Sequence, residues 1–500
     1  MSLPLTGIIG LKDMQNFNDA TDLTAGDVTV ELSVRKGILE TEVPCEPLPV
    51  SPNIPFSTSR GLRFGVITFL LLLSAYFGSI FFQGPLLPLA FLAPKLFRWC
   101  IDWTMASWLL FSEFLIVKVA GVRVRHFGDD FLPHSPDGAS LLLLNHRTQL
   151  DWLFAWGLGA PVQRMKIILK ESLAKFPGVG WAMQCASFIF IRRQIATDQS
   201  RIDTLISYLL NSGAGCEAAN KPGFGTIMSA ALQFMVAAVE IEILKFDDFT
   251  ALDFPNEYSL HFAPASLLIF PEGTNLCSTS LARSNQFARK ANLPYVAYTL
   301  HPRCTGFVYL VTLLGRHRLS AIYDVTVAYP DHIPFPEIDV FAGKVPQEVH
   351  YHVRRISASE LPWDCPDGAS GDLDERLAGW LRAQWMAKEA FLKEYYARPV
   401  EERRFKHEVQ GQSQAFQRDT ITDQLHPTLL GLANAIFWFI SLIVFTYYLY
   451  ISWIVFSFAV LVQITFVYLS IFSGGINFWA SKQLGGPLLT GPVRSLSERS

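Results

Sequence analysis

Two long stretches without a charged residue stand out along the chain, one near each end. The first runs from Phe64 to Pro94 and has basic residues on both sides. A helix needs about 20 apolar residues to cross the hydrocarbon core of a bilayer. This stretch is therefore long enough for one membrane span with a tail. Its Gln83-Gly84-Pro85 sequence also permits a short re-entrant pair of helices.

The second uncharged stretch runs from Pro427 to Ser481, and its apolar core covers residues 429–472. One continuous helix over that core would be about 66 Å long at about 1.5 Å per residue, roughly twice the hydrocarbon thickness. The pattern therefore predicts two antiparallel spans. We place the turn in the Tyr-rich stretch Tyr447–Ser452, because Tyr side chains suit the membrane interface.

The region between these stretches has the pattern of a folded α/β domain. It opens with an amphipathic or interfacial helix over Cys100–Ala120, followed by the alternating segment Val122–Arg125, which reads as a strand. Three continuously apolar runs are typical of strands buried on both faces: Leu141–Leu144, Ser187–Ile191 and Ala265–Phe270. Helical patterns separate them, so we predict a mostly parallel sheet, in which ligands bind beyond the carboxyl ends of the strands.

A further amphipathic helix is predicted over residues 372–396, where apolar residues recur at helical spacing. Asp372 and Glu375 have the spacing of a capping box at its start. Gln384 and Lys388 are polar exceptions on the apolar face of this helix.

Composition agrees with a globular domain joined to membrane segments. Half of the residues are apolar and 17% are charged, against about 25% in typical soluble proteins. The net charge of −3 offers no strongly basic face, so nucleic acid is not an expected partner. The seven cysteines include no Cys-x-x-Cys pair, which favours reduced thiols on the cytosolic side over a disulfide framework.

The first candidate for chemistry is Asn145–Trp152, directly after the Leu141–Leu144 run. His146 and Asp151 would meet if the histidine lies on the turn after the strand and the aspartate on the first turn of the next helix. A carboxylate on one imidazole nitrogen fixes the tautomer and leaves the other nitrogen free as a base. Taken alone, this segment also fits a polar turn with an incidental histidine.

Three other segments carry candidate binding residues. Phe270–Asn275 follows a buried strand, and its glycine permits a sharp turn with close backbone approach to a ligand. Lys166 and Lys170 are one helical turn apart, and Arg193 follows another predicted strand, so these cations suit a phosphate. His301–Phe307 is by itself only a turn. Each segment alone also fits ordinary surface structure.

In their order and composition these four segments resemble the acyltransferase motifs of the glycerolipid acyltransferase family, which includes the 1-acylglycerol-3-phosphate acyltransferases. His146 and Asp151 match its His-x4-Asp pair, Phe270–Thr274 its Phe-Pro-Glu-Gly-Thr, and Pro302 the proline of its fourth motif. Several segments are more similar still to the acyl-CoA:lysocardiolipin acyltransferase branch: Asn145–Trp152, Pro177–Met183, Arg283–Asn285, His301–Phe307 and Asp324–Pro330.

The resemblance implies an enzyme that moves an acyl group from acyl-CoA, a co-substrate, to a lysophospholipid hydroxyl. His146 would be the general base and Asp151 would orient it. The expected acceptor-site residues are Lys170, Arg193, Glu272, Gly273, Thr274 and Pro302. No bound cofactor and no metal is expected, and two histidines, His350 and His352, are interpreted as surface or strand residues. The family also implies the endoplasmic reticulum membrane, with the active site facing the cytosol and membrane lipids as partners.

The sequence departs from the family pattern at two places. Asn275 stands where members that form phosphatidic acid usually carry Arg, which favours lysocardiolipin or another anionic lysophospholipid over lysophosphatidic acid. An insert of unknown role covers about residues 213–259.

Three alternative functions stay open: a phosphatidic acid-forming acyltransferase, a hydrolase that uses the His146–Asp151 pair on water, and a membrane scaffold without activity. A hydrolase would want a Gly-x-Ser-x-Gly or metal motif, and none is present.

These patterns divide the chain as follows: a flexible tail 1–59, a membrane segment 60–99, an acyltransferase domain 100–345, an extension and linker 346–425, two transmembrane helices in 426–475, and a tail 476–500.

Overall fold

The computed structural model describes residues 58–131, 139–155, 165–192, 195–213, 266–335, 337–364, 372–405, 408–409, 412–413, 417–418 and 425–483. Nearly all of the predicted tail 1–59, the insert beyond residue 213, and Arg193 lie outside these ranges. The stretch from 484 to 500 does too, whereas the start of the predicted tail 476–500 forms a short helix, α14 (Ile476–Gln483).

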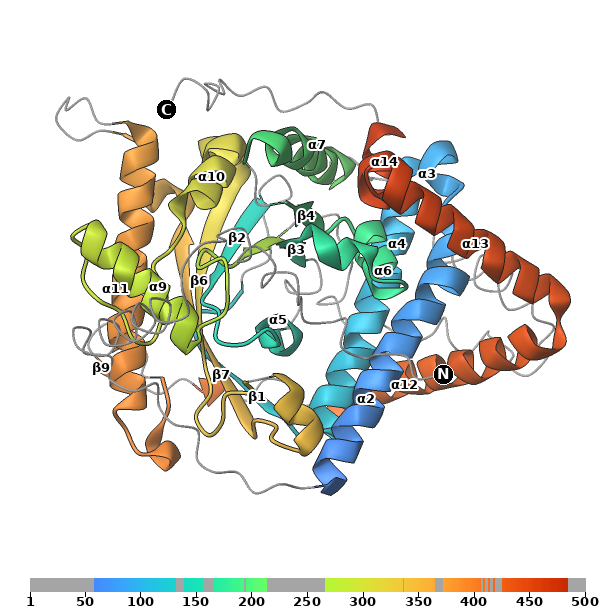
Figure 1. The fold of residues 1–500 in the computed structure, drawn as a ribbon, viewed down its shortest axis with the longest axis horizontal. Helices are drawn as coiled ribbons and strands as arrows, with labels where there is room; N and C mark the ends of the chain where they lie inside the picture. The colour runs from blue at the N-terminus through green and yellow to red at the C-terminus, as the bar shows by residue number, and fades with distance from the viewer. Residues whose placement is uncertain are drawn as a thin grey trace, which may run out of the picture.

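The described part contains a mixed sheet in the strand order β10-β1-β7-β6-β2-β5-β3-β4 (Figure 1). Strands β6, β2, β5, β3 and β4 run parallel, while β7 is antiparallel to β6 and parallel to β1. In chain order the strands are β1 (Arg123–Gly128), β2 (Ala139–Leu144), β3 (Met165–Lys170), β4 (Ile189–Ile191), β5 (Ser266–Ile269), β6 (Leu319–Ala328), β7 (Glu348–Ser357) and β10 (Gln417–Arg418). The predicted mostly parallel sheet is confirmed.

Strand β3 corrects one prediction. Lys166 and Lys170 lie on this strand and not on a helix. A spacing of four residues places two side chains on one face of a strand as well as of a helix, so their spacing could not distinguish the two. The Lys166 ammonium is buried and contacts Asp102 at 2.8 Å, which ties the sheet to the helix before it. Only Lys170 is exposed.

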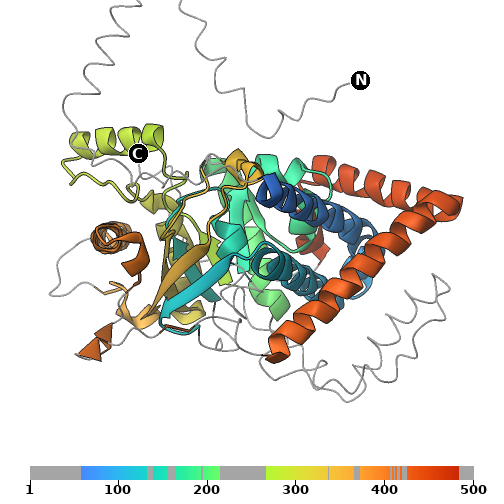
Figure 2. The ribbon, with the colours of Figure 1, turned by 90° about the horizontal axis from the view of Figure 1, so that it is seen from below.

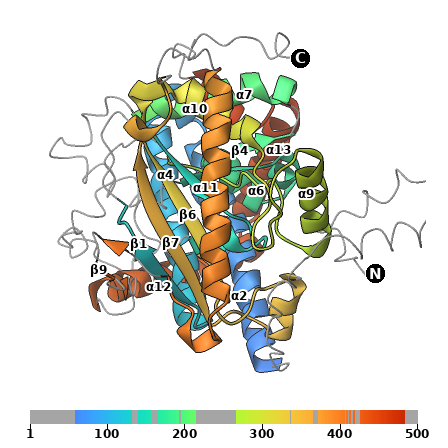
Figure 3. The same cartoon turned by 90° about the vertical axis from the view of Figure 1, so that its left-hand side faces the viewer.

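Helices cover both faces of the sheet. One face packs against α7 (Ile195–Gly213), α10 (Cys304–Arg318) and α11 (Leu373–Tyr396), and Figure 3 shows α11 lying along β6 and β7. The other face packs against the N-terminal helices and α6 (Val179–Cys185). The remaining short elements are α5 (Asp151–Phe154), η8 (Glu171–Lys175), α9 (Ser278–Lys290), η12 (Glu337–Ala342), η13 (Ala358–Glu360), η15 (Val400–Glu402), β8 (Glu408–Val409) and β9 (Gln412–Ser413).

Two long apolar helices lie at the N-terminal side. The first is α2 (Thr58–Phe77), which η3 (Gly78–Gln83) and η4 (Gly84–Leu86) continue. After the short α3 (Leu89–Leu92), α4 (Pro94–Glu113) and η5 (Phe114–Val119) run back alongside it (Figure 1). Both are long and apolar enough to span a membrane. The segment expected as an interfacial helix is thus part of this second helix, and the predicted boundary at residues 99–100 falls inside α4.

The C-terminal stretch forms two further helices of that kind, as predicted. They are α12 (Leu425–Ile451) and α13 (Trp453–Phe472), and they meet at Ser452, inside the predicted turn. Figure 2 shows them diverging as the arms of a V whose apex points away from the sheet. Hydrogen bonds join this pair to the N-terminal pair: Asn434 to Ser107 and Tyr76 to Gln463, at 2.7 and 2.8 Å.

Candidate active site

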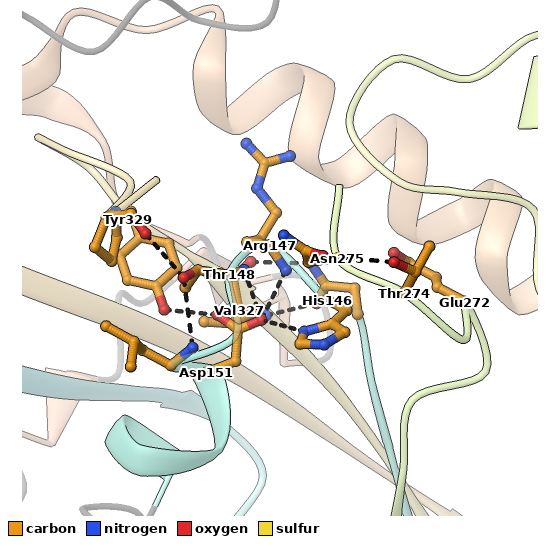
Figure 4. Close-up of polar contacts among 12 residues, drawn as sticks. His146, Arg147, Thr148, Asp151, Glu272, Thr274, Asn275, Val327 and Tyr329 are labelled. Atoms are coloured by element: carbon orange, nitrogen blue, oxygen red, sulfur yellow. Dashed lines mark hydrogen bonds and ion pairs between the residues drawn. The ribbon is translucent and has the colours of Figure 1, made fainter. Parts of the chain in front are cut away.

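The sequence places a histidine and an aspartate at the carboxyl end of β2. Asn145 fixes the turn there, because its amide pairs with the backbone C=O and N–H of Val327 on the neighbouring β6 at 3.1 and 2.8 Å. His146 follows, and Asp151 begins α5. Their side chains meet, with 3.0 Å between His146 Nδ1 and Asp151 Oδ2 (Figure 4).

The Asp151 carboxylate is fully buried and surrounded by donors. Oδ2 accepts the backbone N–H groups of Arg147 at 2.7 Å and Thr148 at 3.1 Å, and Oδ1 accepts the Tyr329 hydroxyl at 2.6 Å. A carboxylate held in this way accepts a hydrogen bond from the imidazole N–H, which assigns the hydrogen to Nδ1 and leaves Nε2 as the basic nitrogen. The His146 side chain is 16% exposed, so the imidazole is not fully enclosed by the protein.

The turn after β5 is locked to this pair. The Phe270 ring stacks near the His146 imidazole, with centroids 4.3 Å apart, and the Leu276 N–H donates to the His146 carbonyl at 2.8 Å. Gly273 has a φ of +74°, a left-handed conformation that favours glycine. Parallel strands β2 and β5 therefore bring the His146 and Phe270–Thr274 segments to one edge of the sheet.

Comparisons with known proteins agree with this geometry. Residues 123–330 match the family model "Acyltransferase" and residues 339–438 match "Acyltransferase C-terminus". Lysocardiolipin acyltransferase 1 of Danio rerio is 36% identical over 65% of this chain and 69% of its own length. The chain belongs to the glycerolipid acyltransferase family. The predicted resemblance, including that to the lysocardiolipin acyltransferase branch, is confirmed.

More distant members of the family also match this acyltransferase. Lysophosphatidylinositol acyltransferase 10 of Caenorhabditis elegans is 29% identical over 67% of this chain and 72% of its own length. The crystal structure of the 1-acyl-sn-glycerophosphate acyltransferase PlsC from Thermotoga maritima covers 68% of this chain and 98% of that chain, at 15% identity and a TM-score of 0.35. Because this TM-score is low, the likeness to PlsC assigns no residue of the site.

The structure directs the Glu272 carboxyl into the interior of the acyltransferase domain. It is 3% exposed and accepts a hydrogen bond from Trp385 Nε1 at 3.1 Å. Burial raises its pKa to about 8, although the Trp385 bond, Lys388 and the backbone N–H groups of His146 and Leu300 act in the opposite direction. The carboxyl therefore faces Trp385 in the interior, and the expectation that Glu272 shapes the acceptor site stays a prediction.

The other expected binding residues lie at several places along the same edge. Gly273 and Thr274 are half-buried in the turn, and Pro302 is buried next to it. Lys170 is exposed at the end of β3, which follows β5 in the sheet. Arg193 falls outside the described residues, and the preceding Arg192 pairs with Glu171 at 3.0 Å. The strand order thus brings Lys170 to the catalytic edge, two strands from β2.

Helix α11 supplies site residues that sequence reasoning did not identify. The Lys388 ammonium is buried, contacts Asp324 at 2.8 Å and donates to the Val325 carbonyl on β6 at 2.7 Å. Burial lowers the pKa of this lysine, and the Asp324 carboxylate opposes that shift. The neighbouring Glu389 binds the 297–299 segment. The sequence already marked Lys388 as unusual, because it is a charged residue on the apolar face of a predicted helix.

Two further residues, Tyr351 and Arg147, hold the loop that carries His146 and Asp151. Tyr351 on β7 donates its hydroxyl to the Asp151 carbonyl at 2.9 Å. The Arg147 guanidinium points away from the His146 ring (Figure 4), donates to the Tyr298 carbonyl at 2.7 Å and lies 5.0 Å from the Tyr396 ring centroid. Arg147 thereby links the catalytic loop to the segment that leads to Pro302.

His350 is a buried strand residue and not a surface one. On β7 its Nε2 lies 2.9 Å from Glu348 and its Nδ1 lies 2.9 Å from the Tyr395 hydroxyl. Burial lowers the pKa of this imidazole, while Glu348 raises it. Within the described ranges, no three His, Cys, Asp or Glu side chains gather in a way that could hold a metal ion.

Proposed function

We propose that this chain is a membrane-bound, acyl-CoA-dependent acyltransferase that acylates lysocardiolipin or another anionic lysophospholipid, in the synthesis or remodelling of phospholipids. The observation that carries the proposal is the His146–Asp151 contact at 3.0 Å, with the imidazole partly exposed beside the Phe270–Thr274 turn. The family membership supports acyl transfer as the reaction, and four membrane-length apolar helices support a lipid substrate.

In the proposed reaction, His146 Nε2 removes the proton from the free hydroxyl of the lysophospholipid. The oxygen attacks the thioester carbon of acyl-CoA, and the carbon–sulfur bond of the resulting tetrahedral intermediate breaks. The proton then passes from the imidazolium to the CoA thiolate, so the products are the acylated phospholipid and CoA. Asp151 stabilises the imidazolium and holds its orientation throughout. No acyl-enzyme and no bound cofactor is required.

The acceptor assignment rests on two observations. Asn275 supplies no positive charge beside the Gly273 turn, where a dianionic phosphomonoester would need it. The relatives named lysocardiolipin acyltransferase and lysophosphatidylinositol acyltransferase carry names of lysophospholipids with phosphodiester head groups. The family resemblance further suggests the endoplasmic reticulum, with the active site on the cytosolic side.

The test is a lysolipid panel with purified protein and labelled oleoyl-CoA. We expect acyl-CoA to be consumed only when a lysophospholipid is present. His146→Ala should lower transfer by about 10²–10⁴-fold, the usual contribution of a general base. The matched control is His317→Ala, an exposed histidine at the far end of α10, which should keep the wild-type rate.

Each alternative predicts a different result. A hydrolase consumes acyl-CoA without lysolipid, and a scaffold consumes none. An enzyme whose highest kcat/KM is with lysophosphatidic acid is a phosphatidic acid-forming acyltransferase. A His146→Ala variant that retains more than a tenth of the wild-type rate would remove this residue from the mechanism.

A further inference from the structure

Position 275 carries Asn instead of a cation, but an arginine from a different loop, Arg303, lies close to the same turn. Arg303 lies across the Gly273 turn, because a Cβ placed on Gly273 would come within 3.2 Å of both Arg303 Cδ and Nε. The two loops are joined through the backbone, where the Arg303 N–H donates to the Pro271 carbonyl at 2.8 Å. The glycine therefore allows the guanidinium stem to lie flat on the turn that follows β5.

Arg303 is exposed to solvent. Among the residues that the structure describes, no carboxylate lies within ion-pair distance of Arg303, whereas Arg316 and Arg354 pair with Asp364 and Asp324. An arginine that packs its stem on a glycine turn and leaves its fork of N–H donors without a carboxylate can bind a phosphate with two parallel hydrogen bonds.

The local backbone adds to the same positive potential. Arg303 is the N-cap of α10, and no side chain caps that helix end. The first turn carries no acidic residue. The unpaired N–H groups of a helix start favour a nearby anion, so the field of α10 and the guanidinium charge act in the same direction.

Arg303 and His146 both contact the turn that follows β5. The Gly273 turn on which Arg303 lies is held to His146 through the Leu276 N–H and the Phe270 ring. A lysophospholipid presents its phosphate a few bonds from its free hydroxyl. A phosphate on Arg303 would therefore lie beside the same turn that contacts the His146 ring.

We propose that Arg303 binds the phosphodiester of the lysophospholipid acceptor and takes over the role of the cation that position 275 lacks. This inference rests on the proposed function. One guanidinium matches the single negative charge of a phosphodiester, which agrees with a preference for lysophospholipids of the lysocardiolipin type over phosphomonoesters.

The experiment compares Arg303→Met and Arg303→Lys in the full-length protein. We expect Arg303→Met to raise the KM for lysophosphatidylglycerol about ten- to a hundredfold, the worth of one lost charge-assisted contact. The KM for oleoyl-CoA and the melting temperature should stay near wild type. Arg303→Lys should restore part of the loss, because it keeps the charge without the planar fork. Lys290→Met, which removes one exposed charge at the end of α9, is the matched control and should match wild type.

Three results would overturn the assignment. A rise in KM for oleoyl-CoA alone would mean that Arg303 binds the acyl-CoA donor, because CoA also carries phosphates. A fall in kcat with both KM values unchanged would make it a support of the loop. Wild-type kinetics in Arg303→Met would remove it from the site. In all three cases wild-type transfer to lysolipid persists, whereas failure of the proposed function would abolish transfer in the wild-type protein itself.

Discussion

Glu389 accepts hydrogen bonds from both the backbone N–H and the hydroxyl of Thr299, each at 2.8 Å. The same carboxylate accepts the N–H groups of Ala297 at 2.6 Å and Tyr298 at 3.0 Å. The Tyr298 carbonyl in turn accepts the Arg147 guanidinium at 2.7 Å. Helix α11 is thus connected to Arg147, the residue next to His146, through two successive hydrogen-bonded contacts.

Glu389→Gln should therefore loosen the catalytic loop. An amide presents one acceptor oxygen, and its NH2 group faces backbone donors, so at least one contact worth about 1.5–3 kcal/mol is lost. We expect a lower melting temperature and a reduced kcat. Glu394→Gln, on the exposed part of the same helix, is the control. A Glu389→Gln protein with wild-type melting temperature and kcat would contradict the positioning role.

Asp151→Asn should be nearly as damaging as His146→Ala, because an amide can donate to Nδ1 and leave the imidazole in the wrong tautomer. Tyr329→Phe removes only the 2.6 Å hydroxyl contact to the other carboxylate oxygen, so we expect a smaller loss, about tenfold or more in kcat. Steady-state kinetics on both variants will rank them. Equal losses, or a larger loss in Tyr329→Phe, would show that the tyrosine has another role.

The buried Glu272 should make stability depend on pH. Its pKa is raised from 4.5 to about 8 in the folded protein, so its contribution to folding is full below pH 4.5 and is lost as the pH rises through 8. We expect the melting temperature to fall over that window. Glu272→Gln cannot ionise and should show a flatter profile, measured by fluorescence melting in detergent. Parallel profiles would mean that Glu272 is ionised throughout.

Asn275→Arg should move the acceptor preference toward lysophosphatidic acid. A second cation would then lie on the turn that Arg303 already crosses, and a phosphomonoester carries nearly two charges at neutral pH. We expect the ratio of kcat/KM for lysophosphatidic acid to that for lysophosphatidylglycerol to rise about tenfold or more. If the wild-type enzyme already prefers lysophosphatidic acid, the argument from Asn275 is wrong.

The two C-terminal helices should form a hairpin with both ends on one side of the membrane. Single cysteines at Asp419 and Ser495, introduced into a background without the native cysteines, flank the pair, although both positions lie outside the described residues. In sealed microsomes we expect an impermeant maleimide to label both positions or neither. Labelling of one position only, followed by labelling of the other after permeabilisation, would exclude the hairpin.

Sequence patterns predicted the features that depend on neighbours in the chain. The break at Ser452 follows from helix length, and the His146–Asp151 pair follows from a strand that ends where a helix begins. The strand at Lys166 was missed because a four-residue spacing fits a strand as well as a helix, and the burial of its ammonium depends on Asp102, a partner from a distant helix. No local pattern predicts that contact.

The same reason explains the direction of Glu272 and the position of Arg303. A Phe-Pro-Glu-Gly-Thr sequence fixes the turn, but whether the carboxyl faces a substrate or Trp385 depends on how α11 packs. Arg303 follows the proline of the fourth motif, and only the loop packing shows that its side chain crosses Gly273. Sequence reasoning therefore placed the candidate residues at one edge of the sheet, but it did not show which residues from other elements contact them.

The contact between Ser107 on α4 and Asn434 on α12 has a consequence during synthesis. Asn434 donates to the Ser107 carbonyl and accepts from its hydroxyl, both at 2.7 Å, across a separation of 327 residues. Because α4 precedes α12 by that distance in the chain, α4 is synthesised first and cannot make this contact until α12 follows. In a chain truncated before α12, the carbonyl and hydroxyl of Ser107 lose their Asn434 partner. The pairing of the N-terminal helices with the C-terminal helices can therefore form only after α12 has been synthesised.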